Sequence, residues 1–416
     1  MAMKDEVIVA VDVGTTKVVA IIAEENGGVL EIGGVGTAAS SGIKNGAVIN
    51  MESTVDSIRK AVHEAELMAG RTVDRVVVSI SGNQIRGFNS HGQVAVPHRE
   101  VREEDVRRVI EAAQATKIPE DRQLIHTLPQ GYIVDSNDVK NHRPVGMAGV
   151  RMEAKVHIVT CAKSSADNLM TCCNRNNLSV GGLVFAGLAA SESVLTEDEK
   201  ELGVAVADIG SGTTDIVIWH GNAVIHTASI PLAGELITND VAQCLRTPRR
   251  EAEKIKVTHG CAFRCQVDDA EEIEVAGMGG RAPVKHKRQF LCDIIEPRVE
   301  EIMWGIHEQL ELSGFMDLLS AGLVITGGTA NLPGIADLAE ANLNMPVRVG
   351  QPNTARFGGL VDIVRGPAFS GVLGLVSWCS GNMVLPSGQK RVVEKKKSGG
   401  LLGMLSGWAK TAYGQN

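Results

Sequence analysis

The sequence predicts an α/β protein with two related halves that face each other across a phosphate-binding cleft. The first observation is an internal repeat. An apolar strand, an aspartate, a glycine-and-threonine turn and a second apolar strand occupy residues 9–19 and recur at 204–218. The second is a further glycine turn, Thr-Gly-Gly-Thr at 326–329, between an apolar run and an expected helix. Two such hairpins facing each other would hold one nucleotide from both sides.

These turns contain the residue types that bind phosphate. Glycine lets the backbone approach a ligand closely, and turn N–H groups and threonine hydroxyls donate hydrogen bonds to phosphate oxygens. Asp12 and Asp208, each at the end of a first strand, can hold a hydrated divalent cation. The predicted binding residues are Asp12, Gly14, Thr15, Thr16, Lys17, Asp208, Gly210, Gly212, Thr213, Thr214, Gly327, Gly328 and Thr329. The spacing fits neither a P-loop nor a Rossmann fingerprint.

Length and composition limit the class of protein. A chain of 416 residues is too long for one ordinary core, so we expect two or more domains. Its hydrophobic content of 44% and charged content of 22% are typical of a soluble globular protein. The formal net charge of -8 argues against general nucleic-acid binding. We expect no signal peptide and no membrane-spanning run.

The 8 cysteines are scattered, and we expect them to be reduced thiols. His259, Cys261 and Cys265 do not have a standard zinc spacing, and no second pair of ligands follows them. We therefore interpret the cysteines as small buried or half-buried side chains.

The first half should alternate between strands and helices. Hydrophobic spacing and β-branched residues predict the hairpin at 6–23, strands at 32–37 and 75–80, and a helix at 53–69. A charged amphipathic helix at 100–117 and extended segments at 124–134 and 154–160 then interrupt the pattern. We interpret residues 87–159 as a small module inserted into the first domain, here called the inserted module. A helix at 164–176, a strand at 183–185 and a helix at 188–194 are expected after it.

The second half should begin at residue 202 with the repeated hairpin. The elements expected after it are a strand at 226–232, helices at 234–245 and 249–260, strands and loops at 267–288, a long helix at 294–312, a strand at 323–326 and a helix from 335. The pattern fades after residue 376, and residues 386–400 have the composition of a flexible basic linker.

The phosphate turns resemble those of the actin-like ATPase superfamily, which includes actin, Hsp70, sugar kinases and bacterial filament proteins. The turns at residues 14–17 and 210–214 match its two phosphate loops, and the turn at 326–329 resembles its adenosine loop. This resemblance implies ATP and Mg²⁺ as ligands. It also implies that Glu253 and Lys256 approach the ribose and adenine. The alternative for Glu253 and Lys256 is an ordinary i,i+3 ion pair on the surface.

Further stretches resemble the FtsA family of bacterial cell-division proteins over essentially the whole chain. They are residues 149–157, 185–189, 193–199, 255–262 and 295–298. FtsA-like proteins also carry a distinctive subdomain between the strands expected at 75–80 and 155–160, whereas actin and Hsp70 carry their insertion elsewhere. The implied fold is the actin-like, ribonuclease H-like two-domain fold with an FtsA-type inserted subdomain.

The resemblance implies six parts of the chain. They are subdomain 1A (1–86 and 160–194), inserted subdomain 1C (87–159), subdomain 2A (195–228 and 310–383), subdomain 2B (229–309), a flexible basic linker (384–400) and an amphipathic membrane-targeting helix (401–416).

One position departs from related ATPases in a way that affects the chemistry. Hsp70-like and MreB-like relatives have Glu-Pro-x-Ala where this chain has Ala-Gly-Leu-Ala at 186–189. In those relatives the glutamate helps position the attacking water, and Ala186 has no acceptor for it. We therefore expect tight Mg-ATP binding with at most slow hydrolysis. Glu192 is close enough in sequence to be an alternative acceptor, or it is simply an exposed helix residue.

The C-terminal tail has the pattern of a short amphipathic helix after a basic linker. Leu401, Met404, Leu405 and Trp408 fall on one face, and Lys410 falls on the other. Such a helix can lie in the interface of an anionic membrane. The alternatives are a helix that docks on the chain's own core, or disorder. The FtsA resemblance favours membrane targeting.

The family resemblance implies a cell-division adaptor. ATP would favour polymerisation into actin-like filaments, and the tail would attach them at the division site to the inner face of the cytoplasmic membrane. Residues 229–309 would capture the C-terminal peptide of FtsZ. Candidate contacts are Arg281, Lys285, Arg288 and Arg298, although ordinary solvated charge explains them too. Later division proteins are further expected partners. The alternatives are a soluble ATP-dependent kinase or phosphatase, or an MreB-like filament protein.

Overall fold

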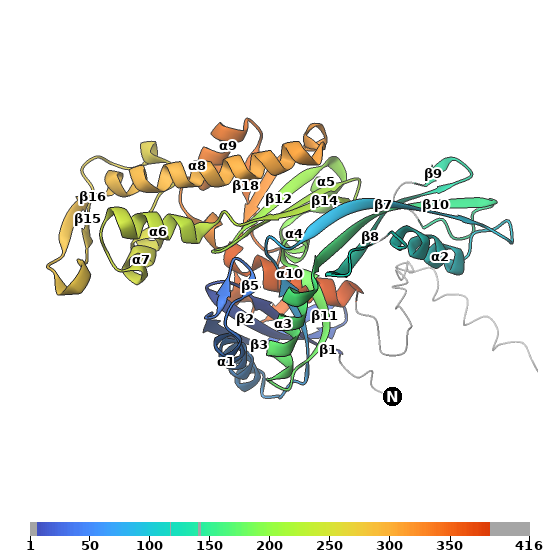
Figure 1. The fold of residues 1–416 in the computed structure, drawn as a ribbon, viewed down its shortest axis with the longest axis horizontal. Helices are drawn as coiled ribbons and strands as arrows, with labels where there is room; N and C mark the ends of the chain where they lie inside the picture. The colour runs from blue at the N-terminus through green and yellow to red at the C-terminus, as the bar shows by residue number, and fades with distance from the viewer. Residues whose placement is uncertain (1–5, 117, 140–142, 383–416) are drawn as a thin grey trace, which may run out of the picture. The chain divides into compact units, whose positions relative to one another are not determined.

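The chain folds into two halves, each built on one β-sheet, with a third sheet in the inserted module (Figure 1). The structure, a computed structural model, describes residues 6–116, 118–139 and 143–382. The expected linker and amphipathic helix lie outside these residues. No helix within the described ranges is long and apolar enough to cross a membrane.

The first half is built on a six-stranded sheet. Its strands, in spatial order, are β11 (Ser179–Phe185), β6 (Arg75–Ile80), β1 (Glu6–Val13), β2 (Lys17–Asn26), β3 (Val29–Ala39) and β19 (Phe357–Gly359). β1, β2 and β3 form an antiparallel meander, and β6 and β11 continue the sheet in parallel. The helices of this half are α1 (Met51–Ala69) and α3 (Lys163–Asn174). Helix α1 begins after Asn50, whose side chain accepts a hydrogen bond from the Ser53 N–H at 3.1 Å.

The second half repeats this arrangement. Its sheet contains β14 (Ala223–Ile230), β13 (Thr214–His220), β12 (Val204–Ile209), β17 (Leu323–Thr326) and β18 (Val347–Val349). β12, β13, β14 and β17 match β1, β2, β3 and β6 in order and direction. The predicted repeat is therefore confirmed. β19 pairs with β3 of the first sheet, although it comes from the range 310–383 that we expected in the second half.

The inserted module has its own sheet and its own small core. Its strands, in spatial order, are β7 (Arg86–Ala95), β10 (Arg151–Ala162), β8 (Arg122–Val134) and β9 (Asn137–Val139), and its helix is α2 (Glu103–Gln114). Val109 and Met152 are buried in this core. Helix α2 is shorter than the predicted 100–117, because the Asp105 carboxylate accepts from the Arg102 N–H at 3.0 Å and starts the helix there.

Residues 229–309 form mostly helices. They contain α6 (Gly234–Cys244), α7 (Arg249–His259), the hairpin of β15 (Glu272–Val275) and β16 (Val284–Lys287), and most of α8 (Arg288–Ser313). Helix α8 begins at Arg288, six residues before the predicted start at 294. The remaining regular elements are β4 (Ile43–Lys44), β5 (Ala47–Val48), α4 (Ala186–Val194), α5 (Glu197–Leu202), α9 (Ile335–Leu343) and α10 (Ser370–Asn382).

One hydrophobic cluster spans both halves, and the second half has a further cluster of its own. Val11 and Val18 of the first sheet, Leu188 of α4, and Val206 and Val217 of the second sheet belong to the same buried cluster. Helix α4 lies buried at this junction because nearly all its residues are apolar or small. The packing brings the turns of both hairpins and the start of α4 to a common cleft.

Candidate functional site

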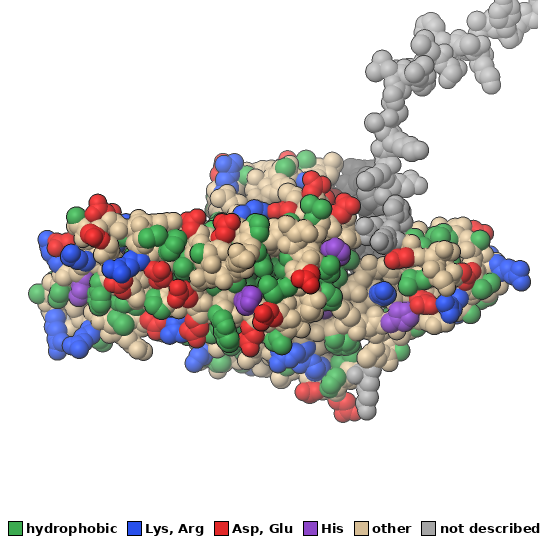
Figure 2. All heavy atoms as spheres, turned by 90° about the horizontal axis from the view of Figure 1, so that it is seen from above, with side chains coloured by type: hydrophobic (Ala, Val, Ile, Leu, Met, Phe, Trp, Pro, Cys, Tyr) green, Lys and Arg blue, Asp and Glu red, His purple; other side chains and the backbone are tan. Residues whose placement is uncertain are grey.

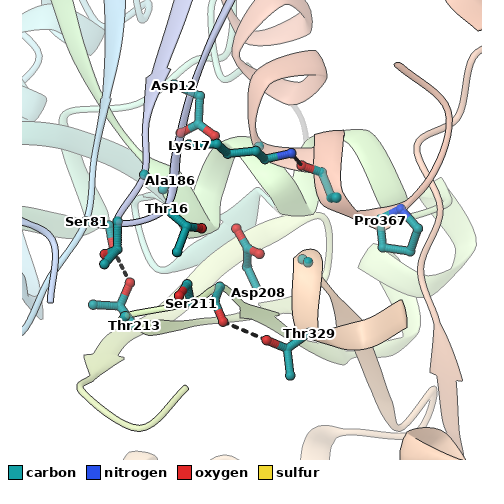
Figure 3. Close-up of a pocket in the computed structure, with 18 of the residues that line it drawn as sticks. Asp12, Thr16, Lys17, Ser81, Ala186, Asp208, Ser211, Thr213, Thr329 and Pro367 are labelled. Carbon is teal, nitrogen blue, oxygen red and sulfur yellow. Dashed lines mark hydrogen bonds between the residues drawn. The ribbon is translucent and has the colours of Figure 1, made fainter. Parts of the chain in front are cut away.

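A cleft of about 440 Å³ lies where the turns of the two hairpins meet (Figure 3). This volume is in the range of small-molecule binding sites. The predicted residues that line the cleft are Asp12, Gly14, Thr15, Thr16, Lys17, Asp208, Gly210, Gly212, Thr213, Glu253, Lys256, Gly327, Gly328 and Thr329. Four segments far apart in sequence, at 12–17, 208–213, 253–256 and 327–329, thus converge on one site.

The two hairpin turns have the same backbone geometry. The Gly14 N–H donates to the Lys17 carbonyl at 3.0 Å, and the Gly210 N–H donates to the Thr213 carbonyl at 2.9 Å. The turns also face each other closely, since a Cβ placed on Gly212 would lie 3.1 Å from the Thr15 Cβ. Only glycine leaves room for this approach, which keeps backbone N–H groups of both turns beside the same space.

Thr214 is the predicted residue that does not line the cleft. It is fully buried, and its hydroxyl donates to the Leu232 carbonyl at 2.6 Å. The matched turn bonds place Thr213, not Thr214, at the position of Lys17. Thr214 therefore corresponds to Val18, the residue that directly follows the last turn residue, Lys17, in the first hairpin. Alternation along a strand points such a side chain to the opposite face.

Carboxylates gather on the two sides of the cleft: Asp215 is buried, and Asp12 and Asp208 are half-buried. The Ser79 hydroxyl donates to Asp12 at 2.6 Å, and burial raises the pKa of Asp12 despite this bond and the charge of Lys17. Burial, with the nearby charges of Asp215 and Asp12, raises the pKa of Asp208 well above its usual value. Burial also raises the pKa of Asp215 to about 6, although the Ser229 hydroxyl donates to it at 2.5 Å. A cation in the cleft would therefore stabilise the ionised carboxylates.

Lys17 extends from the first hairpin to the segment just before α10 (Figure 3). Its Nζ donates to the Ala368 carbonyl at 2.7 Å and lies 4.1 Å from the centre of the Phe369 ring. Burial lowers the pKa of Lys17, while Asp12 and Asp208 oppose this shift. The ammonium group thus lies in the cleft lining near the carboxylates of Asp12 and Asp208.

Glu253 and Lys256 form their i,i+3 ion pair and also line the cleft. Lys256 Nζ lies 2.7 Å from the Glu253 carboxylate and donates to the Thr238 hydroxyl at 2.9 Å. The neighbouring lining includes the apolar side chains of Ile237 and Val257. The i,i+3 ion pair therefore exists, but Lys256 is buried and lines the cleft instead of lying on an open surface.

The sequence reasoning missed several lining residues. Ser79, Ser81 and Asp215 line the cleft, as do the segment at 367–368 and Gly371. The two serines had a detectable signal, because polar residues at the carboxyl end of a parallel strand often face a ligand. The 367–371 segment had no signal in the sequence, since only the tertiary fold brings it to the cleft.

Ala186 lines the cleft and has no side-chain acceptor there. Glu192, the alternative considered above, is absent from the cleft lining and accepts a hydrogen bond from Lys200 Nζ at 2.8 Å. This ion pair fixes Glu192 away from the cleft. No group of three or more His, Cys, Asp or Glu side chains in the described ranges could hold a metal ion directly.

The four candidate FtsZ contacts differ in their surroundings. Arg298 donates to Asp240 on α6 at 3.1 Å, Arg288 donates to Glu271 at 2.6 Å, and Lys285 lies 3.3 Å from Glu272. Arg281 is exposed between β15 and β16. Figure 2 shows basic and acidic side chains interleaved over the end of the molecule that carries β15 and β16, so this surface is not a single basic patch. The candidate membrane residues 401–410 lie outside the described residues.

Solved structures with this fold include a PilM–PilN type IV pilus biogenesis complex, at 16% identity and TM-score 0.63, covering 89% of this chain and 97% of that chain. MreB5 of Spiroplasma citri bound to ADP is similar at 13% identity and TM-score 0.55, covering 90% and 96%. The MamK double helical filament is similar at 12% identity and TM-score 0.51, covering 90% and 98%. These similarities establish an actin-like fold.

Closer relatives identify the family. The cell division protein FtsA of Pseudomonas aeruginosa is 47% identical over 374 residues, covering 90% of this chain and 89% of the relative. The Neisseria meningitidis protein of the same description is 40% identical, covering 99% and 100%. The family described as Cell division protein FtsA matches residues 205–374, and the SHS2 domain inserted in FtsA matches 82–160. The chain therefore belongs to the FtsA family of cell division proteins.

Proposed function

We propose that this chain binds Mg-ATP in the cleft as an assembly ligand, and that its filaments tether FtsZ to the cytoplasmic membrane. One observation carries the nucleotide assignment. Two turns with matched backbone geometry face each other, with Lys17 and the half-buried carboxylates of Asp12 and Asp208 beside them. The backbone N–H groups of the turns, together with Lys17 of the first hairpin, suit the phosphates of a nucleotide. The carboxylates suit the cation that accompanies those phosphates.

Different residues of the cleft would contact different parts of the nucleotide. The turns at 14–17 and 210–213 would bind the phosphates from opposite halves, and Lys17 would neutralise phosphate charge. Asp12 and Asp208 would hold the hydrated Mg²⁺, which would supply positive charge beside the phosphates. Glu253 and Lys256 would contact the ribose and the base. Because the ligand contacts both halves, its binding would favour one relative position of the two.

Slow hydrolysis follows from the alanine at position 186. At position 186 the cleft lining has a methyl group where related ATPases have a carboxylate, and Glu192 is paired with Lys200 elsewhere. The chain would therefore retain ATP for long periods and use it to select an assembling conformation.

The tethering proposal combines three parts of the chain. The tail at 401–416 would bind anionic lipid weakly, and filament formation would join many weak anchors into one strong attachment. Residues 229–309 would bind the acidic FtsZ peptide. Arg281 would contact it directly, whereas Arg288 and Arg298 would have to exchange Glu271 and Asp240 for peptide carboxylates. Later division proteins would be recruited to the assembled filament, at the division site.

One observation favours a second candidate, phosphoryl transfer to a small molecule. Asp215 lines the cleft and has a pKa of about 6, which suits a general base near neutral pH. Ser229 holds this carboxylate by a hydrogen bond of 2.5 Å. A kinase or phosphatase of this fold would show rapid ATP turnover that depends on an acceptor or a phosphoester.

Flotation with liposomes tests the proposed function. Full-length protein and a version ending at Gly400 are mixed with FtsZ and anionic liposomes, with or without Mg-ATP. We expect only the full-length protein to carry FtsZ to the lipid fraction, and to carry more of it with Mg-ATP. Equal flotation of both versions would exclude the tail as the anchor. If neither version floats, the soluble-enzyme alternative gains support.

A further inference from the structure

The inserted module is fixed to the first half through a narrow neck. The chain enters the module after β6 and leaves it through β10 into α3, both elements of the first half. Arg122 links the entering and the leaving segments of the chain. Its guanidinium donates to the Gln84 carbonyl at 2.8 Å, to the Thr160 carbonyl at 3.0 Å and to the Thr160 hydroxyl at 2.9 Å. Because one planar guanidinium group bonds both the entering and the leaving chain segments, the neck resists bending.

The same module rests on a strand of the second half. Figure 1 shows β7, β8 and β10 extending from beside β14. His157 Nε2 lies 2.9 Å from the Thr227 hydroxyl, Asn89 donates to the Ile225 carbonyl at 3.2 Å, and Gln130 donates to the Val224 carbonyl at 3.0 Å. All three long strands of the module thus bond to β14. We call this contact the β14 seat.

Several polar side chains hydrogen-bond to one another at the β14 seat. His157 Nδ1 lies 2.7 Å from the Asn89 side-chain oxygen, and Gln130 donates to that oxygen at 2.9 Å. Burial lowers the pKa of His157 to about 3, so the imidazole is neutral and bonds as a dipole. A network of neutral hydrogen bonds can exchange partners at less cost than an interlocked apolar core.

One buried polar side-chain atom near the β14 seat is unpaired within the described part of the chain. The buried Nε2 of His226, next to Thr227 on β14, has no hydrogen-bond partner among the described residues. Buried polar atoms are normally paired, so an unpaired one requires an explanation. A second position of the module on β14 that paired this nitrogen would recover part of that energy. The seat therefore has a physical reason to adopt more than one arrangement.

A short chain of hydrogen bonds joins the cleft to the neck. The hydroxyls of Ser81 and Thr213 lie 2.9 Å apart, and both residues line the cleft from opposite halves (Figure 3). The Gln84 side chain donates to the Ser81 carbonyl at 2.7 Å, and the Gln84 carbonyl accepts from Arg122. A phosphate bound at the second turn would compete for the Thr213 hydroxyl, at the first link of this chain.

We propose that nucleotide binding in the cleft shifts the inserted module on the β14 seat, so that the module presents a different surface to protein partners. The module is stiffly joined to the first half, so any rotation of the two halves must move it along β14. This inference rests on the proposed nucleotide binding. Because the two equilibria are linked, a change at the seat that favours one position of the module must alter nucleotide affinity.

Hydrogen exchange of the wild-type, full-length protein provides the first test. Backbone exchange at 223–230 and at the facing ends of β7, β8 and β10 is compared with and without a non-hydrolysable ATP analogue and Mg²⁺. We expect exchange rates at the seat to change by about fivefold or more. Analogue binding with unchanged exchange at the seat would overturn the inference and leave the proposed function intact.

Thr227→Val provides the reciprocal test, because it removes the His157 partner without touching the cleft lining. We expect Mg-ATP affinity to change by about fivefold or more. Thr171→Val, on the exposed side of α3, is the matched control and should leave affinity unchanged. Wild-type affinity in Thr227→Val would contradict the coupling. Failure of the wild-type chain to bind Mg-ATP at all would remove the proposed function itself.

Discussion

Asp12 and Asp208 occupy the same place in the two copies of the hairpin, each as the penultimate residue of its first strand. Across the hairpin, however, Asp12 pairs with Val19, whereas Asp208 pairs with Asp215. At the end of the turn the first copy has Lys17 where the second has Thr213. The backbone of the repeat is therefore symmetric, but its charges are not. The first hairpin carries the ammonium group of Lys17, and the second carries the additional carboxylate of Asp215.

Asp208→Ala should weaken Mg²⁺-dependent ATP binding by about 10- to 100-fold, because it removes a group that orients the hydrated cation. ATP binding measured without Mg²⁺ should not weaken, since the substitution removes a negative charge near the phosphates. Calorimetric titration with and without Mg²⁺ separates the two effects. Unchanged affinity in the presence of Mg²⁺ would show that Asp208 is not a cation residue.

Asp215→Asn should stabilise the protein at pH 7.5 when no nucleotide is added. Because the pKa of Asp215 is raised to about 6, the folded chain keeps a proton between about pH 4 and pH 6 that the unfolded chain has lost. Its contribution to the unfolding free energy therefore falls as the pH rises through this window. The gain above pH 6 should be about 1 to 3 kcal/mol. Melting curves at pH 4 and pH 7.5 check this, and an equal shift at both pH values would contradict the assignment.

Ala186→Glu should increase ATP hydrolysis by about tenfold or more, since it restores an acceptor for the attacking water in the cleft. Glu192→Gln is the control and should leave hydrolysis unchanged, because that side chain bonds to Lys200 outside the cleft. Phosphate release under saturating Mg-ATP provides the measurement. An inactive Ala186→Glu variant that still binds ATP would show that another feature limits hydrolysis.

Trp408→Glu should abolish liposome binding and leave ATP affinity unchanged, because a charge replaces the interfacial ring of the tail. Trp304→Glu is a matched control, since Trp304 is 63% exposed on α8 and belongs to neither the cleft nor the tail. Sedimentation with anionic vesicles measures the effect. Retained vesicle binding by Trp408→Glu would place the membrane contact elsewhere.

Arg281→Ala and Arg298→Ala should behave differently although both are candidate FtsZ contacts. Arg281→Ala should weaken binding of the FtsZ peptide without affecting stability. Arg298→Ala should also lower the unfolding free energy by about 1 kcal/mol, because Asp240 loses its bidentate partner. Fluorescence anisotropy and melting curves report the two properties. Normal peptide affinity in both variants would place the FtsZ contact on another surface.

Sequence reasoning predicted the features that depend on local pattern. The repeated hairpin was recognisable because β12 and β13 are buried on both faces and read as continuous apolar runs. Thr214 was misplaced because the Thr-Thr pair in the second copy comes two residues later relative to the backbone turn, which puts Thr214 at the strand position of Val18. Its side chain therefore lies on the strand face opposite to that of Thr213.

Two helices were missed for different reasons. Helix α5 is short, but Thr196 and Glu199 form a capping box that could have revealed its start. Helix α10 contains several glycines and serines, which have weak helix propensity, and it forms because residues such as Leu373 and Val376 are fully buried. The 367–371 part of the cleft and β19 likewise depend on contacts between distant segments, which no local pattern encodes.

The most direct test of the central claim is to measure equilibrium binding and turnover of Mg-ATP on the same full-length sample. The account predicts saturable binding that requires Mg²⁺, with turnover well below about one per second even when FtsZ and liposomes are present. Absence of Mg²⁺-dependent binding would contradict the assignment of the cleft. Turnover above about one per second with a small-molecule acceptor would instead identify an enzyme that consumes ATP.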